Sequence, residues 1–188
     1  MKKIICIAFG VFAISASAQT EAEMEKAWAA YMTPGKVHSM LASEVGSWDE
    51  EMTMWMGPGA QPQKFKMNCE ISMIMGGRYQ QGRHTGDMMG MPFEGISVVG
   101  YNNASGKMES TWVDNMGTGI MYMNAPYDGS SKTIEFKGDV VDPMTKKNKK
   151  FREVYTIVDE NTRKMEMYDV GPNGKEYKSM EIIMKRKK

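Results

Sequence analysis

Along most of this chain, short runs of alternating apolar and polar residues are separated at regular intervals by turn-forming residues. The clearest run covers residues 64–73, KFKMNCEISM, in which every second side chain is apolar. A period of two is typical of a β-strand with one buried and one wet face. Candidate turns rich in glycine, proline, asparagine and aspartate lie at residues 57–59, 76–77, 87–92, 102–106, 115–117, 128–129, 142–143, 159–161 and 173–174. This pattern predicts strands joined as hairpins.

The turns indicate how many strands the chain has, and the short connections indicate that the strands are antiparallel. Nine separators divide residues 46–188 into about ten strands, and no segment between them is long enough for the helical crossover that parallel strands need. Ten antiparallel strands avoid exposed sheet edges most easily by closing on themselves. We therefore expect an all-β fold, an antiparallel meander β-barrel of about ten strands. Residues 19–45 should form short helices that pack on the barrel, because residues 21–32 are rich in helix formers and residues 36–43 carry apolar side chains on one side.

The first 18 residues have the pattern of a secretory signal peptide. Two lysines follow the initial methionine, an apolar run covers residues 4–14, and the small residues ASA at 16–18 offer a cleavage site. The apolar run is too short to span a bilayer. Cleavage after Ala18 would leave 170 residues and remove both lysines, so that the formal charge falls from +1 to about −1. We therefore expect a periplasmic or secreted bacterial protein with no membrane span, and the near-neutral charge argues against a nucleic-acid partner.

Methionine takes the place that leucine usually has in an apolar core. The chain has 22 methionines and a single leucine, Leu41. Several methionines have the two-residue spacing of one strand face: Met52/Met54/Met56, Met73/Met75, Met121/Met123 and Met165/Met167. We interpret most of them as core residues, since methionine is flexible and fills irregular apolar space. The alternative is a Cu(I) site, for which thioether sulfur is a suitable ligand. Its best candidate is the segment HTGDMMGM, and we predict that Met88, Met89 and Met91 do not bind copper.

A Gly-x-Trp step, GSW at residues 46–48, stands where the first strand should begin. It resembles the opening of lipocalin-like (calycin) barrels, in which the tryptophan closes one end and a late basic residue packs across it. Arg186 lies an even number of positions from Ile182 and Met184, so it should point to the same inner face. In a closed antiparallel barrel the end of the last strand lies beside the start of the first. We therefore predict a cation–π contact between Arg186 and Trp48.

Nearly the whole chain that would remain after cleavage resembles a family of mostly bacterial, frequently secreted proteins, domain of unknown function family 1579. The motifs that carry this resemblance are, in order, PGKVH (34–38), GSW (46–48), GGRY (76–79), GMPFEG (90–95), GYNN (100–103), WVDNMGTG (112–119) and MEIIMKR (180–186). Asn102 departs from the family pattern, in which aspartate would be expected. The resemblance supports a calycin-like β-barrel and implies no particular activity, because the family has no established function.

The sequence offers few residues for catalysis or cofactor binding. There are two histidines, His38 and His84, and either could serve as an iron ligand if the barrel bound haem, as some lipocalin-like barrels do. A Ser/His/Asp hydrolase would need an ordered triad and an elbow such as GxSxG, which the sequence does not contain. Histidines, cysteines or carboxylates at zinc-ligand spacing are also missing from it. The sequence therefore predicts no catalytic residues, no metal site, and no cofactor unless haem is bound.

The expected function follows from the width of the barrel. Ten strands give a wider bore than eight, whose interior is filled by side chains or one small ligand, and methionine side chains adapt to apolar ligands. We therefore expect a protein that is not an enzyme and that binds a small apolar or amphipathic molecule. The residues expected to line the site are Met73, Met75, Phe93, Tyr101, Trp112, Asp114, Met121, Met123 and Tyr155. Two alternatives stay open: an enzyme or haem-dependent protein that uses His38 or His84, and an envelope interaction protein whose barrel is filled.

Overall fold

The computed structural model describes residues 20–188, so the expected signal peptide, residues 1–18, lies outside the described residues. Two helices, α1 (Glu21–Met32) and α2 (Lys36–Ala42), come before ten strands. The strands are β1 (Gly46–Met54), β2 (Gln63–Ile74), β3 (Tyr79–Met88), β4 (Met91–Asn102), β5 (Lys107–Asp114), β6 (Met121–Pro126), β7 (Thr133–Val141), β8 (Asn148–Ile157), β9 (Thr162–Val170) and β10 (Glu176–Arg186).

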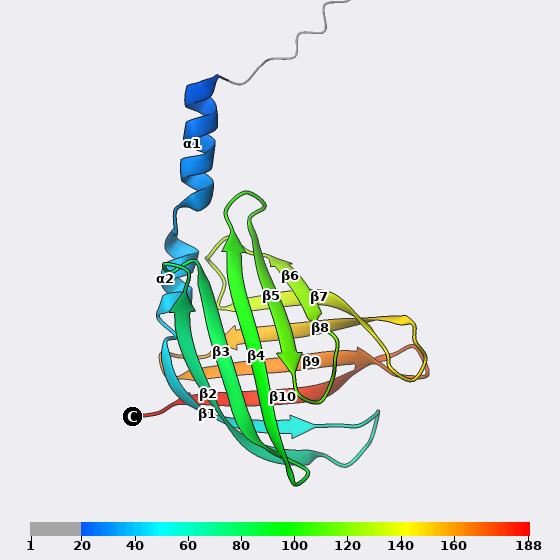
Figure 1. The fold of residues 1–188 in the computed structure, drawn as a ribbon. Coiled ribbons are helices and arrows are strands. Elements are labelled where there is room, and N and C mark those ends of the chain that lie inside the picture. Colours follow the sequence, from blue (N-terminus) through cyan, green and yellow to red (C-terminus); the bar gives the residue numbers. More distant parts are fainter. Residues whose placement is uncertain (1–19) are drawn as a thin grey trace, which may run out of the picture.

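The ten strands form one closed antiparallel barrel (Figure 1). Consecutive strands are neighbours throughout, and β1 closes the barrel by pairing with β10, from Trp48 opposite Arg186 to Met54 opposite Met180. The expected all-β meander is therefore confirmed. Closure leaves no strand edge of the sheet without a partner, which is the physical advantage of this arrangement.

The alternation in the sequence sets which face of each strand is buried. In β2, Met67 and Cys69 are buried, whereas Lys66, Asn68 and Glu70 between and beside them are exposed. Because successive side chains of a strand point to opposite faces, the apolar set lines the inside and the charged set meets water. A register shift of one residue would exchange these sets, so the pairing of β2 is strongly specified.

The connections between strands lie alternately at two rims of the barrel. The helical rim carries α2 and the turns after β2, β4, β6 and β8. The far rim carries the loops after β1, β3, β5, β7 and β9. In Figure 1 the helices and the C-terminus lie at the helical rim, away from the long loops on the right. The two rims are therefore different: one is covered by a helix, and the other is made of loops alone.

Helix α2 covers the helical rim. Its residues Val37 and Leu41 are buried and belong to a core cluster that includes Met108 and Ala125 of the barrel. The side-chain hydroxyl of Tyr127 lies 3.3 Å from the sulfur of Met40 on the same helix. Burial of one apolar stripe of a short helix against the barrel is what holds such a helix in place, since seven residues are too few to be stable alone.

Helix α1 projects away from the barrel, as Figure 1 shows, and none of its residues is buried. It begins with a capping box in which Thr20 and Glu23 each accept a hydrogen bond from the other's backbone N–H. Its C-terminal end is held by Asn103, whose side-chain amide donates to the carbonyl oxygens of Tyr31 and Thr33, among others. α2, not α1, therefore covers the barrel. Among residues 20–188, no helix is long and apolar enough to cross a membrane.

The start of β1 and the end of β10 meet around one tryptophan. Trp48 is fully buried, and its indole N–H donates to the carbonyl oxygen of Glu44. The guanidinium of Arg186 lies 4.3 Å from the centroid of the Trp48 ring, and that of Arg163 lies 5.2 Å from it. Arg186 also donates to the carbonyl oxygen of Val45. The tryptophan is thus held between two cations, at the point where the strand pairing closes the barrel.

Methionine supplies much of the interior. Six methionines are buried in the two core clusters, namely Met52, Met67, Met88, Met108, Met123 and Met184. The single leucine, Leu41, is buried beside them. They come from different strands and are divided between the two clusters, where a flexible unbranched side chain fits an irregular space.

Candidate functional site

A cavity of about 600 Å³ occupies the interior of the barrel. It extends from Leu41 and Glu44 at the helical rim to Met56 and Met116 at the far rim. Met56 and Met116 are both exposed to solvent, so the cavity opens at the far rim. Helix α2 closes the opposite end. A molecule that entered the barrel would therefore pass between the loops of the far rim.

The wall of the cavity is mostly apolar and rich in methionine. Methionine accounts for 14 of its 39 lining residues. These side chains have three rotatable bonds and a polarisable sulfur, so they adapt to ligands of different shape better than branched side chains do. A cavity of this volume lies within the range of known small-molecule sites, which are mostly apolar with a few polar groups that fix the ligand.

Glycines on β3 and β4 leave room for large side chains inside the barrel. A Cβ atom at Gly95 would lie 2.4 Å from two carbon atoms of the Trp112 ring. A Cβ atom at Gly82 would lie 2.6 Å from the hydroxyl of Ser97 and 2.9 Å from Nε2 of His84. Both separations are shorter than non-bonded atoms tolerate. These two glycines therefore hold space for the indole and the imidazole.

Most of the residues predicted to contact a ligand line this cavity. Six of the nine do so: Phe93, Trp112, Asp114, Met121, Met123 and Tyr155. Met73 and Tyr101 instead pack as partly buried residues against the core cluster near α2. Met75 lies elsewhere, because it follows the end of β2, has a positive φ of 51° in the turn and is 70% exposed. The alternation that predicted an inward Met75 stops one residue earlier.

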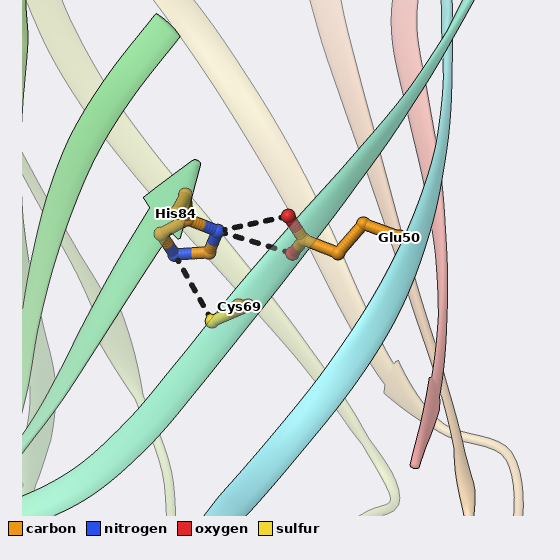
Figure 2. Close-up of side chains that lie close together, drawn as sticks. All are labelled: Glu50, Cys69 and His84. Atoms are coloured by element: carbon orange, nitrogen blue, oxygen red, sulfur yellow. Dashed lines mark hydrogen bonds and ion pairs between the residues drawn. The ribbon is translucent and has the colours of Figure 1, made fainter. Parts of the chain in front are cut away.

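Three polar side chains that line the cavity come from neighbouring strands and lie close together (Figure 2). Nδ1 of His84 on β3 lies 3.0 and 3.1 Å from the two carboxylate oxygens of Glu50 on β1. Nε2 of the same ring lies 3.6 Å from Sγ of Cys69 on β2 and 3.4 Å from the hydroxyl of Ser97 on β4. The imidazole thus bridges a carboxylate and a thiol. If Nδ1 carries the proton that Glu50 accepts, Nε2 presents its lone pair to Cys69 and Ser97.

The protein buries most of this cluster. Glu50 and Cys69 are each 1% exposed, and the ring of Trp112 packs edge-on against His84 at a centroid distance of 5.0 Å. Burial raises the pKa of the Cys69 thiol well above its usual range, and the nearby carboxylate of Glu50 adds to the rise. The free thiol is therefore neutral, not a ready nucleophile, at ordinary pH.

A second polar network joins α2 to the barrel wall at the closed end. The carboxylate of Glu44 is 2% exposed and accepts hydrogen bonds from Nε of Arg163 at 2.6 Å, the amide of Gln80 at 3.0 Å and the hydroxyl of Tyr155 at 2.9 Å. Gln80 also donates to the carbonyl oxygen of Leu41. Burial, followed by the charge of Glu44, raises the pKa of Tyr155 well above its usual value. The polar groups of this network are hydrogen-bonded to one another, so we interpret the network as structural.

Glu153 on β8 differs from these groups because its carboxyl faces the cavity alone. It lines the cavity and is 5% exposed. Within residues 20–188, its carboxyl group has no hydrogen-bond or ion-pair partner. In the same residues, every side-chain polar atom that is fully shielded from solvent does have a partner. The carboxyl oxygens of Glu153 are therefore not fully shielded and must touch the cavity space. Burial alone raises the pKa of Glu153 to about 7. A polar side chain left in this state is a candidate contact for a ligand.

The two histidines occupy different environments. His38 on α2 is buried, and its Nδ1 accepts a hydrogen bond from the backbone N–H of Gly35 at the start of the helix. Burial lowers the pKa of His38. His38 is not among the residues that line the cavity, whereas His84 is. Of the two, only His84 is placed to meet a molecule in the barrel.

The methionines considered for copper differ in their exposure. Met88 is buried and lines the cavity, while Met89, in the turn between β3 and β4, and Met91, the first residue of β4, are 59% and 51% exposed. The prediction that these three do not bind copper stays a prediction, tested by titration with Cu(I).

The sequence matches the model of one protein family. The model of DUF1579, described as a protein of unknown function, matches residues 33–186. The chain belongs to the DUF1579 family. The resemblance seen in the sequence motifs is therefore confirmed, and the matched range runs from the residue before the PGKVH motif through the last strand.

One solved structure shows that the fold of the DUF1579 barrel also occurs in another protein. The crystal structure of Rv2717c from M. tuberculosis matches with a TM-score of 0.60 at 12% identity, covering 83% of this chain and all of that chain. A redesigned β-barrel matches with a TM-score of 0.42 at 14% identity, covering 79% of this chain and 95% of that chain. At such identities the likeness concerns the fold alone. No curated protein matches the sequence.

Several polar residues of the DUF1579 cavity were missed from the sequence, although a signal was present. Glu50 has the same strand parity as Trp48, and Glu153 has the same parity as Tyr155. A charged residue in register with apolar residues points into the barrel, and an inward charge is costly unless it is paired or used. Parity therefore could have identified Glu50 and Glu153 as candidate site residues. The partners that they meet could not be identified in this way.

Proposed function

We propose that this DUF1579 protein binds a small amphipathic molecule inside its barrel, without catalysing a reaction on it. The observation that carries the proposal is the cavity of about 600 Å³, in which methionine is the most frequent lining residue and which opens at one rim. Each methylene group of a ligand that leaves water for such a wall contributes about 0.8 kcal/mol. An apolar chain or ring is therefore the part of the ligand that the wall favours.

The polar end of the ligand is best matched by Glu153. Its carboxyl touches the cavity and has no partner among the described residues. A hydroxyl, amide or amine hydrogen of a ligand would supply the missing hydrogen bond, and a buried polar group gains most from a partner when it has none. We therefore favour an apolar molecule that carries a hydrogen-bond donor over a plain hydrocarbon.

The alternatives receive less support. A haem or enzyme reaction centred on His38 is disfavoured because its ring lies outside the lining and already accepts a hydrogen bond from Gly35. A filled barrel that acts only through its outer surface does not agree with an interior of this volume. His84 stays a candidate for chemistry, since it faces the cavity.

Binding of the neutral dye Nile red, followed by fluorescence, tests the proposal. Ser110 is buried and lines the cavity, so Ser110→Phe places an aromatic ring inside it. We expect this change to weaken dye binding about tenfold or more, which corresponds to ~1.4 kcal/mol. The matched control is Ser72→Phe, on the exposed face of β2, which should bind the dye as the unchanged protein does. Equal affinity of the two variants would contradict binding in the barrel.

We further propose that the protein works in the periplasm or outside the cell. The support is the N-terminal sequence, with its basic start, apolar run and small-residue cleavage site. N-terminal sequencing of the protein isolated from cells should begin at Gln19. A protein that keeps its initial residues and is found with cytoplasmic markers would contradict this location.

A further inference from the structure

We propose that Cys69 and His84 bind a Zn²⁺ ion at a site that opens into the cavity, with Glu50 orienting the imidazole. One donor atom from each of the three side chains lies within 4.8 Å of the other two. Thiolate sulfur and imidazole nitrogen are both donor types that zinc uses in proteins. The inference goes beyond ligand binding, because it concerns a metal ion, and it holds whether or not an amphipathic molecule binds.

The distance between the sulfur and the nearer imidazole nitrogen fits a shared metal ion. Zinc binds thiolate sulfur at about 2.3 Å and imidazole nitrogen at about 2.0–2.1 Å, and a tetrahedral angle between such bonds separates the two donors by about 3.6 Å. Sγ of Cys69 and Nε2 of His84 lie 3.6 Å apart. They therefore already have the separation of two ligands of one zinc ion, with no change in either strand.

Glu50 holds the imidazole in the orientation that metal binding needs. Its two carboxylate oxygens lie 3.0 and 3.1 Å from Nδ1 of His84, the contact that dashed lines mark in Figure 2. Because an ionised carboxylate can only accept, this contact favours the tautomer with the proton on Nδ1 and leaves Nε2 free to bind the metal. Zinc-bound histidines generally donate their other ring N–H to a carboxylate, a carbonyl or water, which fixes the tautomer and makes the bound nitrogen more basic. The buried carboxylate also offsets part of the charge of the cation. We assign Cys69 and His84 as ligands and Glu50 as the positioning residue.

The barrel wall makes the site rigid and leaves one side of it open. Cys69 and His84 are directly paired across β2 and β3, so the register of the sheet sets their spacing. Gly82 has no side chain to intrude on the space between them, and the hydroxyl of Ser97 lies 3.4 Å from Nε2. All of these residues line the cavity. The two remaining positions of a tetrahedral ion therefore face the cavity, where Ser97 or water can fill them.

Titration of the full-length protein with Co²⁺ tests the site, because cobalt replaces zinc and its bond to thiolate absorbs light. We expect one equivalent of Co²⁺ to bind with a thiolate-to-cobalt charge-transfer band, with release of the thiol proton to solvent. Zn²⁺ should then displace the cobalt and abolish the band. Absence of the band at saturating cobalt would overturn the proposal.

Variants identify the ligands. Cys69→Ser should abolish the band, whereas the control His38→Gln, which removes the histidine that does not line the cavity, should keep it. Glu50→Gln should keep the band and weaken binding about 10- to 100-fold, the usual effect of losing a group that orients a metal ligand. If Cys69→Ser folds poorly, His84→Gln carries the test, since it keeps the thiol and should abolish tight binding. A band that survives Cys69→Ser, tight binding that survives His84→Gln, or unchanged affinity in Glu50→Gln would contradict the assignment.

Discussion

Replacing Arg163 by methionine is expected to lower the free energy of unfolding by about 3–5 kcal/mol, the usual cost of removing one partner of a buried ion pair. Arg163 and Glu44 form such a pair, with side chains 4% and 3% exposed. Methionine would fill most of the space of arginine but would leave the carboxylate of Glu44 buried with only Gln80 and Tyr155 as donors. The loss should appear as a lower midpoint in urea unfolding at pH 7, with an unchanged slope.

The matched control is Arg83→Met on the outside of the barrel. Arg83 pairs with Glu94 at 2.9 Å, but their side chains are 61% and 48% exposed. Pairs of this kind contribute about 0–1 kcal/mol, because water screens them and ordering two long side chains costs entropy. A loss of the same size in both variants would show that the network below α2 has no special role in stability.

Replacing Glu153 by glutamine is expected to stabilise the protein by about 3 kcal/mol at pH 8 and to change its stability little near pH 4.5. Burial raises the pKa of this carboxyl from 4.5 to about 7, and a tenfold change in a proton-binding constant corresponds to about 1.36 kcal/mol. Glutamine has nearly the same shape and no charge at any pH. The measurement is chemical unfolding of both proteins across this pH range.

The sign of the pH dependence follows from which state holds the proton. Between about pH 4.5 and 7 the folded protein keeps the proton of Glu153, whereas the unfolded chain loses it. The unfolded state then binds fewer protons, so stability falls as the pH rises through this window and the loss is complete above about pH 7. In Glu153→Gln, the part of the fall in stability that comes from this carboxyl should be missing. A difference between the two proteins that stays constant with pH would contradict an isolated buried carboxyl.

The barrel could be predicted from the sequence because its determinants are local. Alternation in segments such as residues 64–73 specifies which face of a strand is buried, and the turn residues specify where each strand ends. The pairing of Arg186 with Trp48 came from the resemblance to lipocalin-like barrels together with parity, since closure of an antiparallel barrel brings the last strand beside the first. The barrel itself needs only the period of a strand and the rule that sheet edges are costly.

The site could be predicted only in part because it depends on register. Cys69 and His84 are 15 residues apart, and they meet because the turn after β2 places them opposite each other. Glu50 reaches the same point from a third strand. A search for closely spaced ligands in the sequence could not detect this cluster. Met75 shows the opposite error, since a periodic pattern was extended one residue past the end of its strand.

Entry of a ligand into the methionine-lined cavity is the central claim, and the methionines themselves can report on it. In protein labelled with ¹³C at the methionine methyl groups, addition of decanol should shift the NMR signals of Met123 and Met184, which are buried and line the cavity. The signals of Met144 and Met75, which are 91% and 70% exposed, should not move. Shifts confined to the exposed methionines, or no shifts at saturating decanol, would contradict binding inside the barrel.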